Sequence, residues 1–327
     1  MNKILKLIRW NDWYDSKLPF LFLTYYYLII INNEVNMQSL ILLFPLSILF
    51  IALMSFGYML NDYFDKSIDN NSGKENALSS LTELNQIIIL IIVLFIGLIA
   101  FIPFYQYKFS FVFLFFYYLS SFIYSAYPFR LKEKGVWGLV FASLGQRIFP
   151  ILIVFTVFEY FQFETLIFLI LSFFIGLRWI LVHQVLDYEN DKKTSVETFV
   201  VNETPLRIYN LMLYVFAFEV IIAAIFVGII YAAIPNILYL LIAYLLYELY
   251  LYPFWKQLGF KRMLLSYDFA PLADFYSLWI PLGLSFFLSY LNPLYFIVVL
   301  VEILWKIRYV KFDLGLIKLK RLYHESK

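Results

Sequence analysis

Regularly spaced polar side chains with metal-binding chemistry stand out in one stretch of the chain. Asn61, Asp65 and Asp69 follow an apolar run over residues 40–60 and recur at every fourth position. If the helix continues past the apolar run, the three side chains share one face, one turn (roughly 5–6 Å between Cβ atoms) apart. Carboxylates aligned at the end of a membrane helix repel one another and are costly to desolvate, so they need a positive partner. A row of oxygen ligands suits a hard cation such as Mg²⁺.

A second acidic stretch lies past the middle of the chain. Asp187 and Asp191 are again four positions apart, and they also stand at the end of an apolar run. Two acidic helix ends at corresponding places in two halves of a chain predict one site between them. Because Mg²⁺ commonly bridges a few carboxylates to substrate phosphates, we predict that the shared ligand is a diphosphate.

The composition indicates a membrane protein. The chain has 327 residues, of which 63% are hydrophobic, and its mean hydropathy is +0.79. Apolar runs of about 17–25 residues recur along its whole length, which is typical of a polytopic helical membrane protein. The net charge is only +2, and the basic residues lie in short loops, so no nucleic-acid partner is expected. The absence of cysteine excludes disulfides and thiolate chemistry.

We expect an all-α transmembrane bundle of nine or ten helices that forms one integral-membrane domain over residues 1–327. Asn292-Pro293 either separates the last two helices or kinks a single one. The acidic motifs divide the domain into halves of about 18–158 and 164–310. The expected helices lie near 18–32, 39–60, 84–105, 109–127, 136–158, 164–185, 206–232, 235–252, 274–291 and 293–310.

The distribution of lysine and arginine predicts the orientation. With the N-terminus in the cytoplasm, every one of the 25 lysines and arginines falls in a cytoplasmic segment except Lys108, Arg147 and Arg178. This asymmetry is the one expected of inner loops. We therefore expect a multi-pass protein of the cell membrane with both acidic motifs on the cytoplasmic side.

At these motifs the chain resembles the UbiA superfamily of intramembrane prenyltransferases. Residues 61–69 match the family's N-x-x-x-D-x-x-x-D motif, and residues 187–191 match its D-x-x-x-D motif, which a basic residue follows. Residues 124–132 resemble the family's Tyr-Ser…Pro…Arg-Leu-Lys segment. The chain departs from the family after the first motif, where Lys74 replaces the usual Arg-Pro pairs, and at Ser195, where glycine is usual.

The resemblance implies transfer of a prenyl group from an isoprenoid diphosphate to an acceptor within the membrane, in a central cavity that membrane lipids can reach. It implies two Mg²⁺ ions held by Asn61, Asp65, Asp69, Asp187 and Asp191. Lys74, Arg130 and Lys132 would neutralise the remaining phosphate charge, and Tyr124 and Tyr188 would shield a cationic intermediate. The residues expected to act directly in catalysis are Asp65, Lys132, Asp187 and Asp191.

Two further residues are candidates for binding the acceptor. His183 precedes Asp187 by one turn and would face the site on a regular helix. Arg147 falls inside a predicted helix, where a charge usually pairs or lines a cavity. The alternative for Arg147 is structural pairing. Two charges of each sign fall inside predicted helices and suggest compensating pairs, although the sequence does not give the partners: Arg147, Arg178, Glu219 and Glu248.

The acceptor stays open, since the superfamily uses aromatic acids, glycerol lipids, tetrapyrrole propionates and sugar phosphates. A second reading of the same scaffold is a terpene cyclase, in which the prenyl cation closes on itself. A third is a transporter whose acidic clusters bind a cation, although such sites usually lie near the midplane on broken helices.

Overall fold

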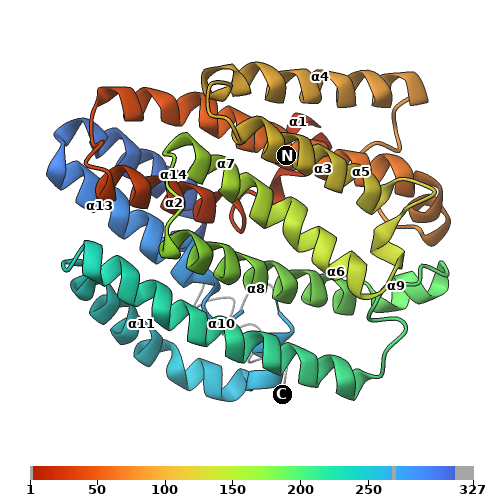
Figure 1. The fold of residues 1–327 in the computed structure, drawn as a ribbon. Helices are drawn as coiled ribbons and strands as arrows, with labels where there is room; N and C mark the ends of the chain where they lie inside the picture. The colour runs from red at the N-terminus through yellow and green to blue at the C-terminus, as the bar shows by residue number, and fades with distance from the viewer. Residues whose placement is uncertain (1–2, 267–269, 314–327) are drawn as a thin grey trace.

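The computed structural model describes residues 3–266 and 270–313, and all the regular structure in these ranges is helical (Figure 1). The all-α prediction is therefore confirmed. The first half contains α1 (Lys3–Leu7), α2 (Leu18–Ile31), α3 (Met37–Ser72), α4 (Glu83–Phe101), α5 (Ser110–Ser125), α6 (Val136–Ser143) and α7 (Phe149–Val157). The second contains α8 (Phe163–Leu186), α9 (Tyr188–Lys193), α10 (Pro205–Ala233), α11 (Ile237–Leu258), α12 (Phe260–Leu264), α13 (Ile280–Leu291) and α14 (Phe296–Asp313).

Each of the ten expected helix ranges coincides with a helical segment, with two informative differences. The helix expected over residues 39–60 continues to Ser72, because Gly73, in a left-handed conformation, ends it only there. Asn292 is extended, so it separates α13 from α14 instead of kinking one helix. Residues 314–327 of the expected domain lie outside the described residues.

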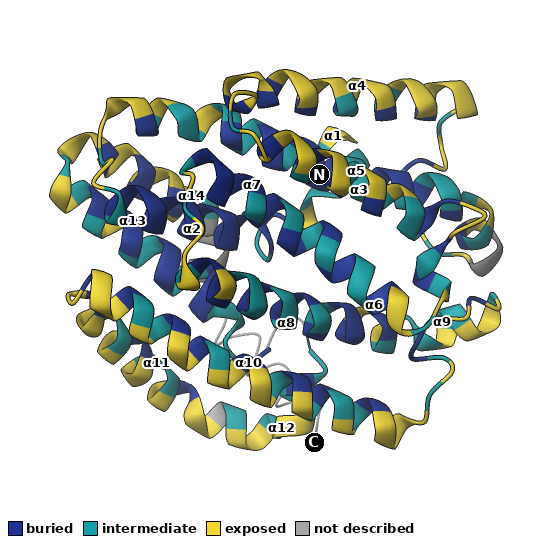
Figure 2. Cartoon of the chain, viewed as in Figure 1, coloured by how far each residue is buried: buried dark blue, intermediate teal, exposed yellow. Residues whose placement is uncertain are grey.

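Several of these helices have the length and composition of membrane spans. Five described segments are long and apolar enough to cross a membrane on these criteria, and five further apolar helices have 10–17 residues. The long ones cover Met37–Asn70, Glu83–Phe104, Val136–Val157, Phe163–Leu186 and Pro205–Ala233. Exposed residues follow the outer sides of α4 and α11 (Figure 2), and on α4 they include Ile88, Ile92, Phe95 and Ile99. An apolar outer surface of this kind fits a lipid environment.

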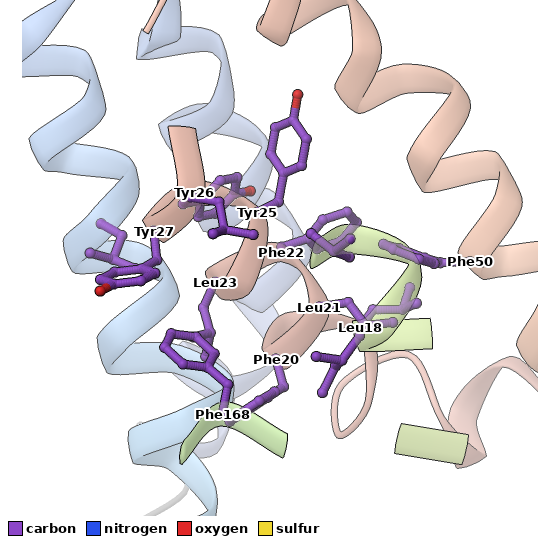
Figure 3. Close-up of a cluster of buried hydrophobic side chains, with 14 of the residues drawn as sticks. Leu18, Phe20, Leu21, Phe22, Leu23, Tyr25, Tyr26, Tyr27, Phe50 and Phe168 are labelled. Atoms are coloured by element: carbon purple, nitrogen blue, oxygen red, sulfur yellow. The ribbon is translucent and has the colours of Figure 1, made fainter. Parts of the chain in front are cut away.

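The centre of the bundle is α2. Its residues are apolar all round, and all of them from Leu18 to Ile30 are buried, which is the pattern of a core helix. Figure 3 shows its side chains projecting in several directions, with Phe50 of α3 and Phe168 of α8 among their surroundings. Tyr26 donates a hydrogen bond to Glu302 of α14 (2.9 Å), which ties α2 to α14.

Two short π-helical turns each lie directly before a helix that has a proline near its start. One spans Leu144–Ile148 between α6 and α7, and the other spans Phe275–Trp279 before α13. Each precedes a proline at the second position of the next helix, Pro150 and Pro281. A proline has no N–H to donate to the carbonyl four residues earlier, so the helix widens there. Both turns contribute side chains to the main cavity described below.

A buried ion pair joins α8 to α10. Arg178 donates two hydrogen bonds to the Glu219 carboxylate, at 2.6 and 2.8 Å, and a third to the carbonyl of Pro271 at 3.0 Å. Both side chains are fully buried. The expectation that charges within the helices pair is confirmed for these two residues.

Removing one partner of this ion pair leaves the other charge unpaired in the core. We expect Arg178→Met to destabilise the protein by about 3–5 kcal/mol and to lower the temperature of thermal unfolding followed by tryptophan fluorescence in detergent. Arg207→Gln is the matched control, because its ion pair with Glu203 lies on the surface. Equal unfolding temperatures for the two variants would contradict a structural role for Arg178.

Candidate active site

The continuation of α3 to Ser72 brings the first motif into position. Asn61 and Asp69 lie on successive turns on either side of Asp65, and all three line a cavity of about 80 Å³. Asp187 and Asp191 line the same cavity from the end of α8 and from α9. Basic residues complete the wall: Lys74, Arg130 and Lys132. The structure thus brings the two motifs and the three predicted phosphate-binding cations together.

Asp65 is held by two cations from the segment after α5. Arg130 donates to one carboxylate oxygen at 2.9 Å, and the Lys132 ammonium bonds the other. Lys132 also donates to Asn61 Oδ1 at 3.1 Å. Burial lowers the pKa of Lys132, although the neighbouring Asp65 charge opposes the shift. The pKa of Arg130 is raised, since its bond to Glu133 and the charge of Asp65 outweigh the effect of burial.

Lys74 connects the two motifs. It follows α3 and donates to Asp187 Oδ2 at 2.7 Å. Burial acts to raise the pKa of Asp187, but His183 and Lys74 together lower it below its usual value. His183 Nε2 lies 3.6 Å from the same carboxylate oxygen, and His183 lines the small cavity as predicted from the helical spacing. The single basic residue in the loop after the first motif therefore contacts the second motif.

The remaining two carboxylates have neutral partners. Asn76 donates to Asp69 at 2.8 Å, and Thr198 donates to Asp191 at 3.2 Å. Burial, reinforced by the charge of Asp187, raises the pKa of Asp191 to about 6. Asp191 is therefore the acidic group of the second motif that most readily takes up a proton.

A larger cavity of about 1080 Å³ adjoins the small one and shares part of its wall. Residues lining both are Asn61, Lys74, Tyr124, Ile180, His183 and Asp187. Arg147 lines the large cavity from the first π turn, as does much of the inner face of α11. Tyr188 lines neither cavity, contrary to the role expected of it. It packs against a separate apolar cluster with its ring 5.6 Å from Lys192 Nζ.

Sequence patterns did not identify several residues of the site. Asn76 and Thr198 were missed because a lone amide or hydroxyl in a polar loop carries no spacing signal. Arg9 was counted only as a basic residue of the N-terminal segment, yet it donates to Asp62 at 2.8 Å and ties that segment to α3. Lys17 was likewise counted only as a topological charge, although it lines the large cavity.

The oxygen donors of this site match the chemistry of a hard divalent cation. They comprise one amide and four carboxylates, without thiolates. Within the described ranges, however, no three acidic or imidazole side chains converge closely enough to hold a metal ion. Each carboxylate instead meets an N–H or O–H donor of the chain. These residues would hold a metal only together with further oxygens, such as those of a phosphate.

The chain belongs to the UbiA prenyltransferase family, whose family model matches residues 20–266. Its apolar helices together with this membership indicate a multi-pass membrane protein. No curated protein sequence matches the chain significantly.

The fold is similar to that of solved UbiA relatives. A UbiA homolog from Archaeoglobus fulgidus superposes with a TM-score of 0.61 at 20% identity, covering 91% of this chain and 99% of that one. The same homolog bound to GPP and Mg²⁺ gives 0.58 at 18% identity, covering 86% and 99%. A digeranylgeranylglyceryl phosphate synthase gives 0.50 at 18% identity, covering 92% and 97%.

A double-mutant cycle tests whether Asp65 and Lys132 stabilise the fold as a coupled pair. We expect Lys132→Gln to destabilise the protein by roughly 3 kcal/mol, because it leaves part of a buried carboxylate charge uncompensated. Adding Asp65→Asn is expected to recover much of that loss. Thermal unfolding in detergent measures both, with the exposed neighbour Lys134→Gln as control. Additive effects of the two substitutions would show that the pair is not coupled.

Proposed function

We propose that the protein catalyses Mg²⁺-dependent transfer of a prenyl group from an isoprenoid diphosphate to an acceptor within the membrane. The observation that carries the proposal is the small cavity. It gathers four carboxylates and an amide of two distant motifs with three cations, beside a cavity large enough for a lipid chain. Family membership and the relatives bound to GPP or DMAPP with Mg²⁺ support the same assignment.

The division of charge in the site suits a metal-bound diphosphate. We assign Asn61, Asp65, Asp69, Asp187 and Asp191 as the metal-holding residues. Bound Mg²⁺ would supply Lewis-acid stabilisation of the leaving diphosphate. The cations that now pair with Asp65 and Asp187 would bind diphosphate oxygens, which arginine and lysine do well: Lys74, Arg130 and Lys132.

The large cavity is suited to the rest of the substrates. Its side chains include Trp179 of α8, Phe216 and Val220 of α10 and Leu245 of α11, which offer an apolar path for a prenyl chain. Tyr124 lines both cavities, so its ring lies where a developing allylic cation can be shielded from water. His183 and Arg147 line the part left for the acceptor, whose alignment supplies part of the rate.

The location of the reaction follows from the charge distribution of the sequence. We place the protein in the cell membrane with both acidic motifs towards the cytoplasm, where Mg²⁺ and soluble diphosphates are available. The chain acts as one integral-membrane domain whose two halves each contribute one motif.

Diphosphate release by the purified protein tests the proposal. With geranyl, farnesyl or geranylgeranyl diphosphate we expect release that requires Mg²⁺ and stops with EDTA. Asp65→Asn/Asp187→Asn should reduce it at least 100-fold, about the loss seen when transition-state charge stabilisation is removed. Glu189→Gln is the matched control, because Glu189 stands between the two aspartates of the second motif but is exposed.

Mass spectrometry of the lipid products separates the related outcomes. Products with an added acceptor support transfer, cyclised hydrocarbons would assign a terpene cyclase, and prenyl alcohols indicate hydrolysis. Failure to bind any isoprenoid diphosphate in a Mg²⁺-dependent way would refute the proposal and favour a cation transporter.

The raised pKa of Asp191 predicts how metal binding depends on pH. A metal must displace a proton from this carboxyl below about pH 6, so the affinity for Mg²⁺ and GPP should fall about tenfold per pH unit there and level off above it. Thr198 stabilises the charged carboxylate, so Thr198→Val should move the midpoint to higher pH. Protonation of GPP itself would give the same midpoint in both proteins, and this result would contradict the assignment to Asp191.

A further inference from the structure

Arg147 is a buried guanidinium to which the described part of the chain supplies no partner. Its side chain is only 3% exposed, Nη2 is wholly buried, and it makes no hydrogen bond or ion pair within that part of the protein. It lines the large cavity from the first π turn. A cation in the membrane interior is costly unless it is paired. Structural pairing of Arg147 is not seen among the described residues: Glu219 binds Arg178 and acts on Arg147 only through its charge, and Glu248 accepts from Trp255.

The backbone around Arg147 makes room for this side chain. On the facing helix α8, a Cβ added to Gly176 would lie 3.1 Å from Arg147 Cγ. Any larger residue at that position would crowd the arginine. Because Pro150 disrupts the helical hydrogen bonding, the π turn presents Arg147 to the cavity.

Lys17 is a second cation of the same cavity, and the described residues supply no carboxylate partner to it. It is 6% exposed, and within the described part of the chain its ammonium bonds only the Tyr58 hydroxyl, with Nζ 4.2 Å from the centre of that ring. Burial lowers the pKa of Lys17 well below its usual range, and the charge of Arg147 lowers it further. The charges of Asp12 and Asp15 oppose this shift without forming an ion pair with Lys17. Lys17 and Arg147 are thus close enough to repel each other.

The other cations of this wall are already compensated. Arg9 contacts both Asp12 (2.7 Å) and Asp62 (2.8 Å), and Lys74 contacts Asp187. The acids Asp15, Glu248 and Asp274 also line the cavity. Glu248 and Asp274 accept hydrogen bonds from the uncharged Trp255 indole and the Phe275 backbone N–H, so these bonds do not neutralise their charge. Lys17 and Arg147 are therefore the cations of this wall that form no ion pair with a described residue, and the wall also offers uncharged polar groups on Ser120, Ser121 and Gln146.

We propose that Lys17, Tyr58 and Arg147 bind the headgroup of the acceptor, and that this headgroup is a phosphate monoester. This inference rests on the proposed function and names its acceptor class. A phosphate monoester carries about −1.5 to −2 charges at pH 7 and matches two cations, whereas a carboxylate matches one. The arginine fork binds phosphate through two parallel hydrogen bonds, and lysine adds a point charge. Tyr58 precedes Asn61 by three residues on α3, so the headgroup is held beside the diphosphate site.

Three probes with the same ring and different charge test the site: phenyl phosphate, benzoate and phenol. Binding is measured by calorimetry with the detergent-purified protein in EDTA. We expect phenyl phosphate to bind at least tenfold more tightly than benzoate, and phenol to show no measurable binding. Lys17→Gln and Arg147→Gln should each weaken phenyl phosphate at least tenfold, and Arg147→Lys should weaken it less. Lys134→Gln, at an exposed position of the same segment that lines neither cavity, should leave it unchanged, and Lys132→Gln reports any binding at the donor site.

The outcomes separate this site from the donor site. Mg²⁺-dependent GPP binding is measured on every variant, and its retention shows that Lys17→Gln and Arg147→Gln are folded. Equal or tighter binding of benzoate would overturn the phosphate class in favour of a carboxylate acceptor. Phenyl phosphate binding that is absent, or that depends on Lys132 instead of Lys17 and Arg147, would overturn the site itself. If the unaltered protein binds phenyl phosphate but not GPP, the proposed function is refuted while the anion site is supported.

Discussion

Compensation of carboxylate charge at the ends of membrane helices is the constraint on which this structure depends. The chain meets it with its own cations and donors. Arg130 and Lys132 neutralise Asp65, and Lys74 reaches from the end of α3 to Asp187. Since single removal of a buried partner leaves an uncompensated charge, these contacts fix the loop after α3 and the segment after α5 relative to the two motifs. In our account the carboxylates would hold the metal, and the same cations would bind the diphosphate.

The bundle separates two polar regions, the small cavity and part of the large cavity, from its apolar core. The wholly buried α2 fills the centre, and the ion pair of Arg178 with Glu219 joins α8 to α10. The π turns before Pro150 and Pro281 open the helices where side chains must face the large cavity. The charges at the motifs are thus paired, whereas Lys17 and Arg147 in the large cavity form no ion pair with any described residue. We connect this difference with the two substrates, a metal-bound donor and an anionic acceptor.

The sequence predicted the features that depend on local spacing. Helix positions follow from the apolar runs, and the stacking of Asn61, Asp65 and Asp69 follows from helical periodicity, which holds because α3 continues through the motif. Tyr188 was misplaced because a residue next to Asp187 points about 100° away around a helix. Partners such as Asn76 and Thr198 depend on how loops fold back, and the lack of a partner for Arg147 among the described residues depends on the whole bundle. Neither property can be obtained from the spacing of residues along the chain.

The most direct test of the central claim is electron paramagnetic resonance of Mn²⁺, used in place of Mg²⁺, with an inert thiolo analogue of geranyl diphosphate. If both motifs hold metal around one diphosphate, two Mn²⁺ ions bind per chain, their signals show mutual dipolar coupling, and tight binding requires the analogue. Asp65→Asn and Asp187→Asn should each abolish the coupling. Mn²⁺ bound equally well without the analogue, or two uncoupled ions, would contradict a single site shared by the two motifs.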